Sequence, residues 1–151
     1  MTVSTTAQQP VSLCATDLRN RLQSIADFKN KNLFVFDEDD LADKIKGVAL
    51  PAAGVMYEGM RSIPEAGSNT RIGLSAELVF SIMVISRAEN IANVDSKTPL
   101  LNLLDEIRKS LLATRSPTGH YWKFVVEAAT RESKGMVFWV QRWQTTIQLT
   151  Q

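Results

Sequence analysis

A long run of alternating side chains, residues 71–86, constrains the fold of this chain more than any other feature. Every second position from Ile72 to Val84 is apolar, and the positions between them are mixed, with Glu77 and several serines among them. A period of two over this length predicts a β-strand with one apolar and one mixed face. Strands in globular domains usually have about 5–6 residues, so we expect this one to bend or to extend past its own sheet. An overlong strand with a semi-apolar outer face favours assembly over catalysis.

Composition and charge exclude several classes of protein. The chain has 151 residues, enough for one domain, and its 44% hydrophobic and 22% charged residues are typical of a globular protein. A net charge of +1 provides no global field to attract nucleic acid or anionic lipid. The most apolar window, Leu78–Ile85, is far shorter than the roughly 20 residues that span a bilayer, so we expect no membrane partner. Residues 1–9 lack the charged and apolar regions of a signal peptide.

Periodicity, capping residues and turn residues predict the other elements. The expected order is a helix from Thr16 to Phe28, a strand at 33–36, a short helix capped by Asp37 and ending near Gly47, strands at 53–63 and 71–86, a helix from Thr98–Pro99 to Leu112, and strands at 122–128 and 136–149. The predicted fold is therefore an α+β domain with a mainly antiparallel twisted sheet and helices packed on one face. We expect residues 1–12 to form a flexible N-terminal arm and residues 13–151 to form the single domain.

The residue types that usually carry catalysis are scarce. Cys14 is the only cysteine and His120 the only histidine, and they lie far apart in the sequence. We expect a buried Cys14 and an exposed His120 in a turn. The acidic run Asp37–Asp40 suits the first turn of a helix, where carboxylates favour the positive end of the helix dipole, better than a metal site. No catalytic, cofactor-binding or metal site, and no cofactor, is predicted.

Aromatic residues concentrate in the last two predicted strands: Tyr121, Trp122, Phe124, Phe138, Trp139 and Trp143. Such residues build stacking platforms in single-strand nucleic-acid binders. The basic residues beside them are few, so we favour core packing for half of them and interface burial for the rest.

Four segments of the chain together resemble a known family. They are a Leu-Pro-x-x-x-Val-x-Tyr-x-Gly strand (residues 50–59), the long apolar strand (residues 72–86), a Leu-rich helix with Ile107-Arg108 (residues 99–112), and a closing strand Gly-Met-Val-Phe-Trp-Val-Gln-Arg-Trp (residues 135–143). The pattern is similar to the tail terminator, or tail completion, proteins of tailed bacteriophages, particularly the Mu-like contractile-tail type. The resemblance covers residues 14–149, so the predicted domain is tail-terminator-like.

The resemblance implies a structural virion protein and no enzyme. Such proteins form a ring, typically a hexamer, that caps the head-proximal end of the tail tube and ends polymerisation of the tube and of any sheath. The implied partners are further copies of the chain, the tail tube protein, a sheath protein and the neck or head-completion protein, with DNA passing through the lumen without sequence-specific binding. The implied location is the tail or neck of the virion, assembled in the host cytoplasm.

The candidate contacts with subunits and partners come from position and exposure. The loops 61–71 and 87–97 carry Arg61, Glu65, Arg71, Arg87 and Glu89. On the outer face of the long strand, Val79, Met83 and Ile85 form an apolar patch that would favour burial against another subunit. A glutamate at Val79 or Met83 is therefore expected to give folded monomers.

Three alternatives remain open from the sequence alone. The first is another neck or connector protein between the portal and the tail. The second is a small enzyme or ligand-binding α+β protein that uses Asp37–Asp40, Glu77 or His120, which would require a concave pocket with converging polar groups. The third is a single-strand nucleic-acid binder, which would bind with a steep dependence on salt.

Overall fold

The computed structural model describes residues 9–25, 28, 32–37, 39–63, 74–87, 94–133 and 135–149. Its elements are α1 (Pro10–Gln23), β1 (Leu33–Val35), α2 (Leu41–Lys44), β2 (Ala52–Ser62), β3 (Leu74–Arg87), α4 (Val94–Leu111), β4 (Lys123–Ser133) and β5 (Met136–Leu149). The type and order of these described elements agree with the prediction.

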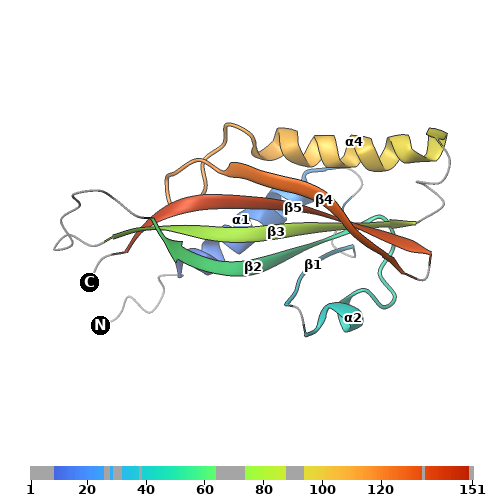
Figure 1. Cartoon of the computed structure of the whole chain (residues 1–151), viewed down its shortest axis with the longest axis horizontal. Coiled ribbons are helices and arrows are strands. Elements are labelled where there is room, and N and C mark those ends of the chain that lie inside the picture. The colour runs from blue at the N-terminus through green and yellow to red at the C-terminus, as the bar shows by residue number, and fades with distance from the viewer. Residues whose placement is uncertain are drawn as a thin grey trace.

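The five strands form one twisted sheet in the order β1-β2-β3-β5-β4. β1 is parallel to β2, and the other three strand pairs are antiparallel. The long strands β3 and β5 pair without interruption from Leu74–Leu149 to Arg87–Met136. Figure 1 shows α4 running along the sheet beside β4, with α1 behind the central strands. The predicted α+β fold with a mainly antiparallel sheet is confirmed.

The core lies between the sheet and the helices α1 and α4. Along β3, the even-numbered side chains from Ala76 to Val84 are fully buried and form one cluster with apolar residues of both helices. Phe80 packs edge-on against Trp122, with ring centroids 5.8 Å apart. Because each fully buried large apolar side chain contributes about 1.5–3 kcal/mol, this single face of β3 accounts for a large part of the stability.

Both long helices begin before the predicted residues. α1 starts at Pro10 with Gln9 as N-cap, so the prediction of Thr16 as N-cap is wrong, as is the assignment of residues 10–12 to an arm. Proline suits the first helical position because its missing N–H needs no partner there. Residues 1–8 of the predicted arm lie outside the described residues. α4 begins at Val94, one turn before Thr98–Pro99, since a proline close to a helix start removes few helical hydrogen bonds.

β4 is longer than predicted, and β-bulges explain the difference. The register between β4 and β5 shifts between Phe124 and Val126 and again between Ala129 and Arg131. Each bulge inserts a residue that reverses the alternation of side chains. The period of two therefore ends early in the sequence, although the strand continues to Ser133.

Candidate interaction surface

Among the described residues, neither α1 nor α4 covers one face of the sheet, and this face holds the outer side chains of β3 that the sequence singled out. We call the side chains of β2, β3 and β5 that point away from α1 and α4 the helix-free face. Its members on β3 are Ser75, Glu77, Val79, Ser81, Met83 and Ile85, which lie opposite residues of even number on β5. The face is mixed, because charged and polar groups alternate with apolar ones along each strand.

Two networks of charged side chains cross the helix-free face. Arg142 on β5 donates from Nε to Glu58 Oε2 at 2.7 Å and from Nη2 to Oε1 at 3.1 Å, and the Ser81 hydroxyl donates to the same carboxylate. Nearer the end of β2, Arg61 donates to Glu77 at 2.9 Å and to Gln144 at 3.1 Å. Arg61 thus meets a carboxylate on the neighbouring strand β3, and Arg142 reaches across β3 to a carboxylate on β2, so the networks tie β2, β3 and β5 together.

The environment of Glu58 favours its charged form. Burial by itself would raise the pKa of this carboxyl, but the hydrogen bonds from Arg142 and Ser81 outweigh burial and hold the pKa below its ordinary value of 4.5. A folded-state pKa below the unfolded-state value means that ionised Glu58 stabilises the fold above pH 4.5. This contribution is lost as the pH falls through the folded-state pKa.

We therefore expect Glu58→Gln to be destabilising at neutral pH and nearly neutral in acid. The pair with Arg142 is partly exposed, so the expected loss at pH 7 is about 0.5–1 kcal/mol. Urea unfolding at pH 7 and pH 3 would measure it, with the difference from wild type shrinking at pH 3. The control is Asp43→Asn, whose pair with Lys46 is almost wholly exposed and should show no change. An equal loss at both pH values would contradict this account of Glu58.

The apolar residues predicted on this face have unequal exposure. Val79 and Met83 are half-buried, Val79 beside Gln144 and Met83 beside Val140. Ile85 is fully buried, so the expectation of an exposed Ile85 is wrong. It pairs with Phe138 and Ala52 at the end of the face where Phe36 is also buried.

The packing of two aromatic rings at this end of the sheet requires a glycine on β2. Phe34 on β1 lies opposite Gly54 on β2, and the Phe34 and Phe36 ring centroids are 5.5 Å apart. A Cβ atom at Gly54 would come within 2.4 Å of the Phe34 ring and 2.8 Å of the Phe36 ring. Glycine therefore lets both rings pack against the backbone of β2.

The charged candidates are only partly described. Arg61 has a largely exposed side chain within its network on the helix-free face, and Arg87 is exposed at the end of β3. Glu65, Arg71 and Glu89 lie outside the described residues.

The residues considered for catalysis lie in separate places. Asp37 accepts hydrogen bonds from the backbone of Asp39 and Asp40 in the turn before α2, and Asp40, not Asp37, is the N-cap. Glu77 lies on the helix-free face. The carbonyl of exposed His120 accepts a hydrogen bond from Thr145, whose side chain is on the opposite face. Among the described residues, no group of three or more histidine, cysteine or acidic residues is placed to hold a metal ion.

The one cysteine is buried, as predicted. Cys14 lies in the core on α1, and burial raises the pKa of its thiol to about 11. A thiol with this pKa is almost entirely protonated at neutral pH, so it is a poor nucleophile.

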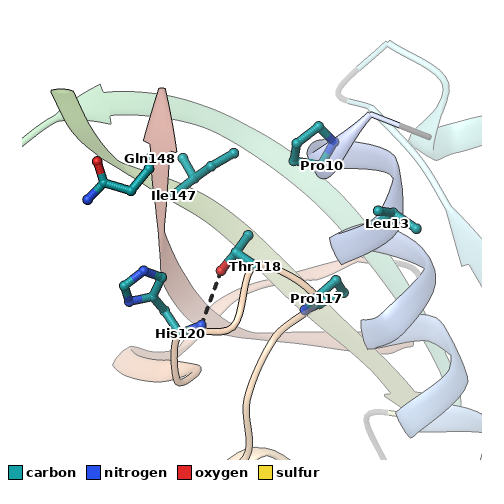
Figure 2. Close-up of a pocket in the computed structure, with 7 residues that line it drawn as sticks. All are labelled: Pro10, Leu13, Pro117, Thr118, His120, Ile147 and Gln148. Carbon is teal, nitrogen blue, oxygen red and sulfur yellow. Dashed lines mark hydrogen bonds between the residues drawn. The ribbon is translucent and has the colours of Figure 1, made fainter. Parts of the chain in front are cut away.

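A shallow pocket lies between the start of α1, the turn after α4 and the end of β5 (Figure 2). Its lining residues are Pro10, Leu13, Pro117, Thr118, His120, Ile147 and Gln148. The Thr118 hydroxyl donates to the carbonyl of Thr146 at 2.7 Å, so its proton is already used in a hydrogen bond within the fold. The volume of about 250 Å³ is below the usual range of ligand sites, so the pocket adds little support to a ligand-binding function.

The most exposed apolar side chains of the sheet lie on strands that border its two edges, which the sequence did not predict. On β4 these are Phe124, Val125 and Val126, each about 40% exposed. Near the opposite edge, Val35 on β1 and Tyr57 and Met60 on β2 are exposed to a similar degree.

The aromatic residues divide between the core and the surface. Trp122, Phe138 and Trp143 are buried, Trp139 packs against the main core, and Tyr121 and Phe124 are exposed. The Tyr121 ring is covered by the Arg115 guanidinium at 4.4 Å. This arrangement agrees with core packing for half of the set and does not form a row of free stacking rings.

Comparison with known proteins supports the fold. No protein family matches the chain, and no curated protein does. Among solved structures, a chain from the virion of a native gene transfer agent particle aligns with a TM-score of 0.58 and 14% identity, over 95% of this chain and 100% of that chain. At this identity the likeness shows a shared fold and nothing further.

Two structures from Akkermansia muciniphila align more weakly. A crystal structure has a TM-score of 0.36 and 9% identity, over 95% of this chain and 83% of that one. A structure without its transmembrane region has a TM-score of 0.33 and 11% identity, over 99% and 92%. These scores are too low to support an argument. Within the described part of this chain, no helix has the length and apolarity needed to cross a membrane.

Proposed function

We propose that this chain is a structural component of a phage-like virion, and more specifically a tail terminator. In this role, copies of the chain form a ring, expected to be a hexamer, on the head-proximal end of the tail tube. The ring ends polymerisation of the tube and of any sheath, and the neck docks on it. The chain acts as a binding protein without catalytic activity.

The observation that carries the proposal is the full-length fold likeness to a chain of a gene transfer agent virion. It agrees with the independent resemblance of residues 14–149 to tail terminators. The exposed apolar side chains near both sheet edges also favour a protein in which these edges are covered by other protein chains. The arginines of the helix-free face are paired with carboxylates, so this face would hold passing DNA only weakly.

Two kinds of contact belong to the proposal. Val79 and Met83 on the helix-free face contact another subunit or a partner protein. The charged groups Arg61, Glu65, Arg71, Arg87 and Glu89 contact neighbouring rings, the tail tube or the neck.

The test is the mass of the purified protein in solution, alone and with tail tubes of its own particle, followed by electron microscopy. We expect a ring, or density at one end of each tube. A monomer that leaves the tubes bare would overturn the proposal. Binding only to the neck side of tails that are already capped would favour the alternative, a connector between the portal and the tail.

Val79→Glu tests the helix-free face within the same experiment. Val79 is half-buried between Gly59 and Gln144, so the variant should fold, but a carboxylate there must lose its water on contact with another protein. We expect the tube-end density to be lost while the circular dichroism spectrum is unchanged. Val79→Thr, of similar shape, should retain assembly. Capping by a folded Val79→Glu variant would exclude this part of the face from the contact.

A further inference from the structure

Both edges of the sheet have long stretches of unpaired backbone among the described residues. β4 is the last strand of the sheet, and its outer edge has no strand partner along 11 residues. At the other side, β1 pairs only with residues 53–55 of β2. The outer edge of β2 from Tyr57 to Ser62 therefore has no described strand beside it. Such edges are templates for pairing with another chain.

The directions of β4 and β2 allow the two edges to pair as antiparallel strands. β2 and β5 run the same way, because each is antiparallel to β3, and β4 runs opposite to both. If a second copy is placed beside the first with its sheet in the same orientation, its β2 meets β4 as an antiparallel neighbour. The pattern of antiparallel strands then continues across the junction, and the helices of both copies stay on the same side.

The side chains at the edges do not oppose this pairing. The residues of β4 between the bulges include one charged group, Glu127, which turns to the helix side and bonds Arg108 and Gln141. On β2, the carboxylate of Glu58 and the guanidinium of Arg61 already have partners on the same sheet. Within residues 126–129 of β4 and 57–62 of β2, the charged side chains therefore all have partners, while the exposed Lys123 lies before the first bulge of β4.

Bulges occur on the same two strands. The register of β2 shifts between Tyr57 and Gly59, and that of β4 shifts twice. Bulges increase local twist and are frequent where sheets curve and close. The uninterrupted pairing of β3 with β5 lies in the middle of the sheet, and the bulges lie in the strand pairs on either side of it.

We propose that copies of this chain join edge to edge, with the outer edge of β4 in one copy pairing with residues 57–62 of β2 in the next. Six paired residues span about 20 Å and bring the exposed apolar residues of the two strands together. A pairing of β4 with β4 would cover one edge of each copy and leave Tyr57 and Met60 exposed, whereas the proposed junction covers both edges. Because it uses two different surfaces, it is heterologous, and it closes into a ring when the rotation between neighbouring copies is a whole fraction of a full turn. The inference deepens the proposed self-assembly and is independent of the virion role.

The experiment is cross-linking of a double variant, Arg61→Cys with Val126→Cys, by a short bismaleimide. Arg61 pairs with Glu77 and Val126 pairs with Arg142, so both side chains point to the helix-free face. Val126 is 40% exposed and the Arg61 side chain is 66% exposed, so the substitutions should be tolerated, and buried Cys14 gives little background. We expect a ladder of covalent dimers, trimers and higher species. Neither single variant should exceed the wild-type background, and an equal mixture of the two single variants should stop at dimers.

A matched control replaces the β2 position by one in the middle of the sheet. Gln144→Cys with Val126→Cys keeps the second thiol on the same face, but Gln144 is flanked by Val79 on β3 and by Lys123 on β4, so this variant should give no ladder. Dimers of Val126→Cys alone would show a β4–β4 junction and overturn the proposal, as would the absence of cross-links from the double variant. A ring detected by its mass but without cross-links would overturn the pairing of β4 with β2 and leave the proposed ring in place. A ladder from protein that does not bind tail tubes would support the pairing of the edges and overturn the terminator role.

Discussion

Replacing Gln141 by leucine is expected to destabilise the fold by about 2–4 kcal/mol, although the substitution adds an apolar side chain to a core. Gln141 is fully buried between β5 and α4. Its Nε2 donates to the Leu104 carbonyl at 3.0 Å and to Glu127 at 2.8 Å, and its Oε1 accepts from the Trp143 indole at 3.0 Å. Leucine leaves the indole N–H buried without an acceptor and removes one donor from Glu127.

Urea and thermal unfolding measure this loss, which corresponds to a fall in Tm of roughly 5–15 °C for a chain of this size. Trp143→Phe provides the matched control, because it removes the indole N–H and keeps a buried aromatic ring. In that background Gln141→Leu should cost less, and the difference gives the coupling between the two side chains. A Gln141→Leu variant within 0.5 kcal/mol of wild type would show that the network contributes little to stability.

The elements that could be predicted from the sequence are those in which one regularly spaced set of side chains is buried. β3 alternates strictly and α4 repeats leucines at helical spacing, because each has one side against the same core. Gln141 shows the limit of this reasoning. It occupies a core position of β5, and its burial depends on Leu104 and Glu127, which are distant in the sequence. A polar residue in a buried position is understood only when its partners are known.

Most of the candidate surface could not be predicted from the sequence, because it depends on the β-bulges and on the strand order. Glu58 lies at a bulge, so its side could not be assigned by counting alternate residues from Tyr57. Ile85 has the outward position that the alternation predicts, but it is buried. It lies at the end of the sheet where Phe36, just after β1, is also buried and packs close to Gly54 of β2, a contact between residues far apart in the sequence. The exposure of Val126 depends on β4 being the last strand, and strand order leaves no local mark in the sequence.

Asp17 is the second residue whose loss should have a large effect, because it connects three elements. One carboxylate oxygen accepts from the Trp122 indole at 2.9 Å and from Arg21 Nε at 2.9 Å. Arg21 in turn donates to the carbonyls of Ser110 and Arg115 at 3.2 and 3.1 Å. The network joins α1 to the end of α4 and to the segment that enters β4.

We expect Asp17→Ala to destabilise the fold by about 2–3 kcal/mol, since it leaves the buried Trp122 indole without its acceptor and frees Arg21 from its fixed orientation. Asp17→Asn keeps an acceptor oxygen of the same reach and should lose less than half of that amount. Unfolding in urea measures both variants, and amide exchange should quicken in α1 of Asp17→Ala before it does in β3. Equal losses for the two variants would mean that the charge, and not the bond to Trp122, holds α1 in place. If α1 loosened while edge cross-linking persisted, the contacts between copies would be carried by the sheet alone, as the pairing of β4 with β2 requires.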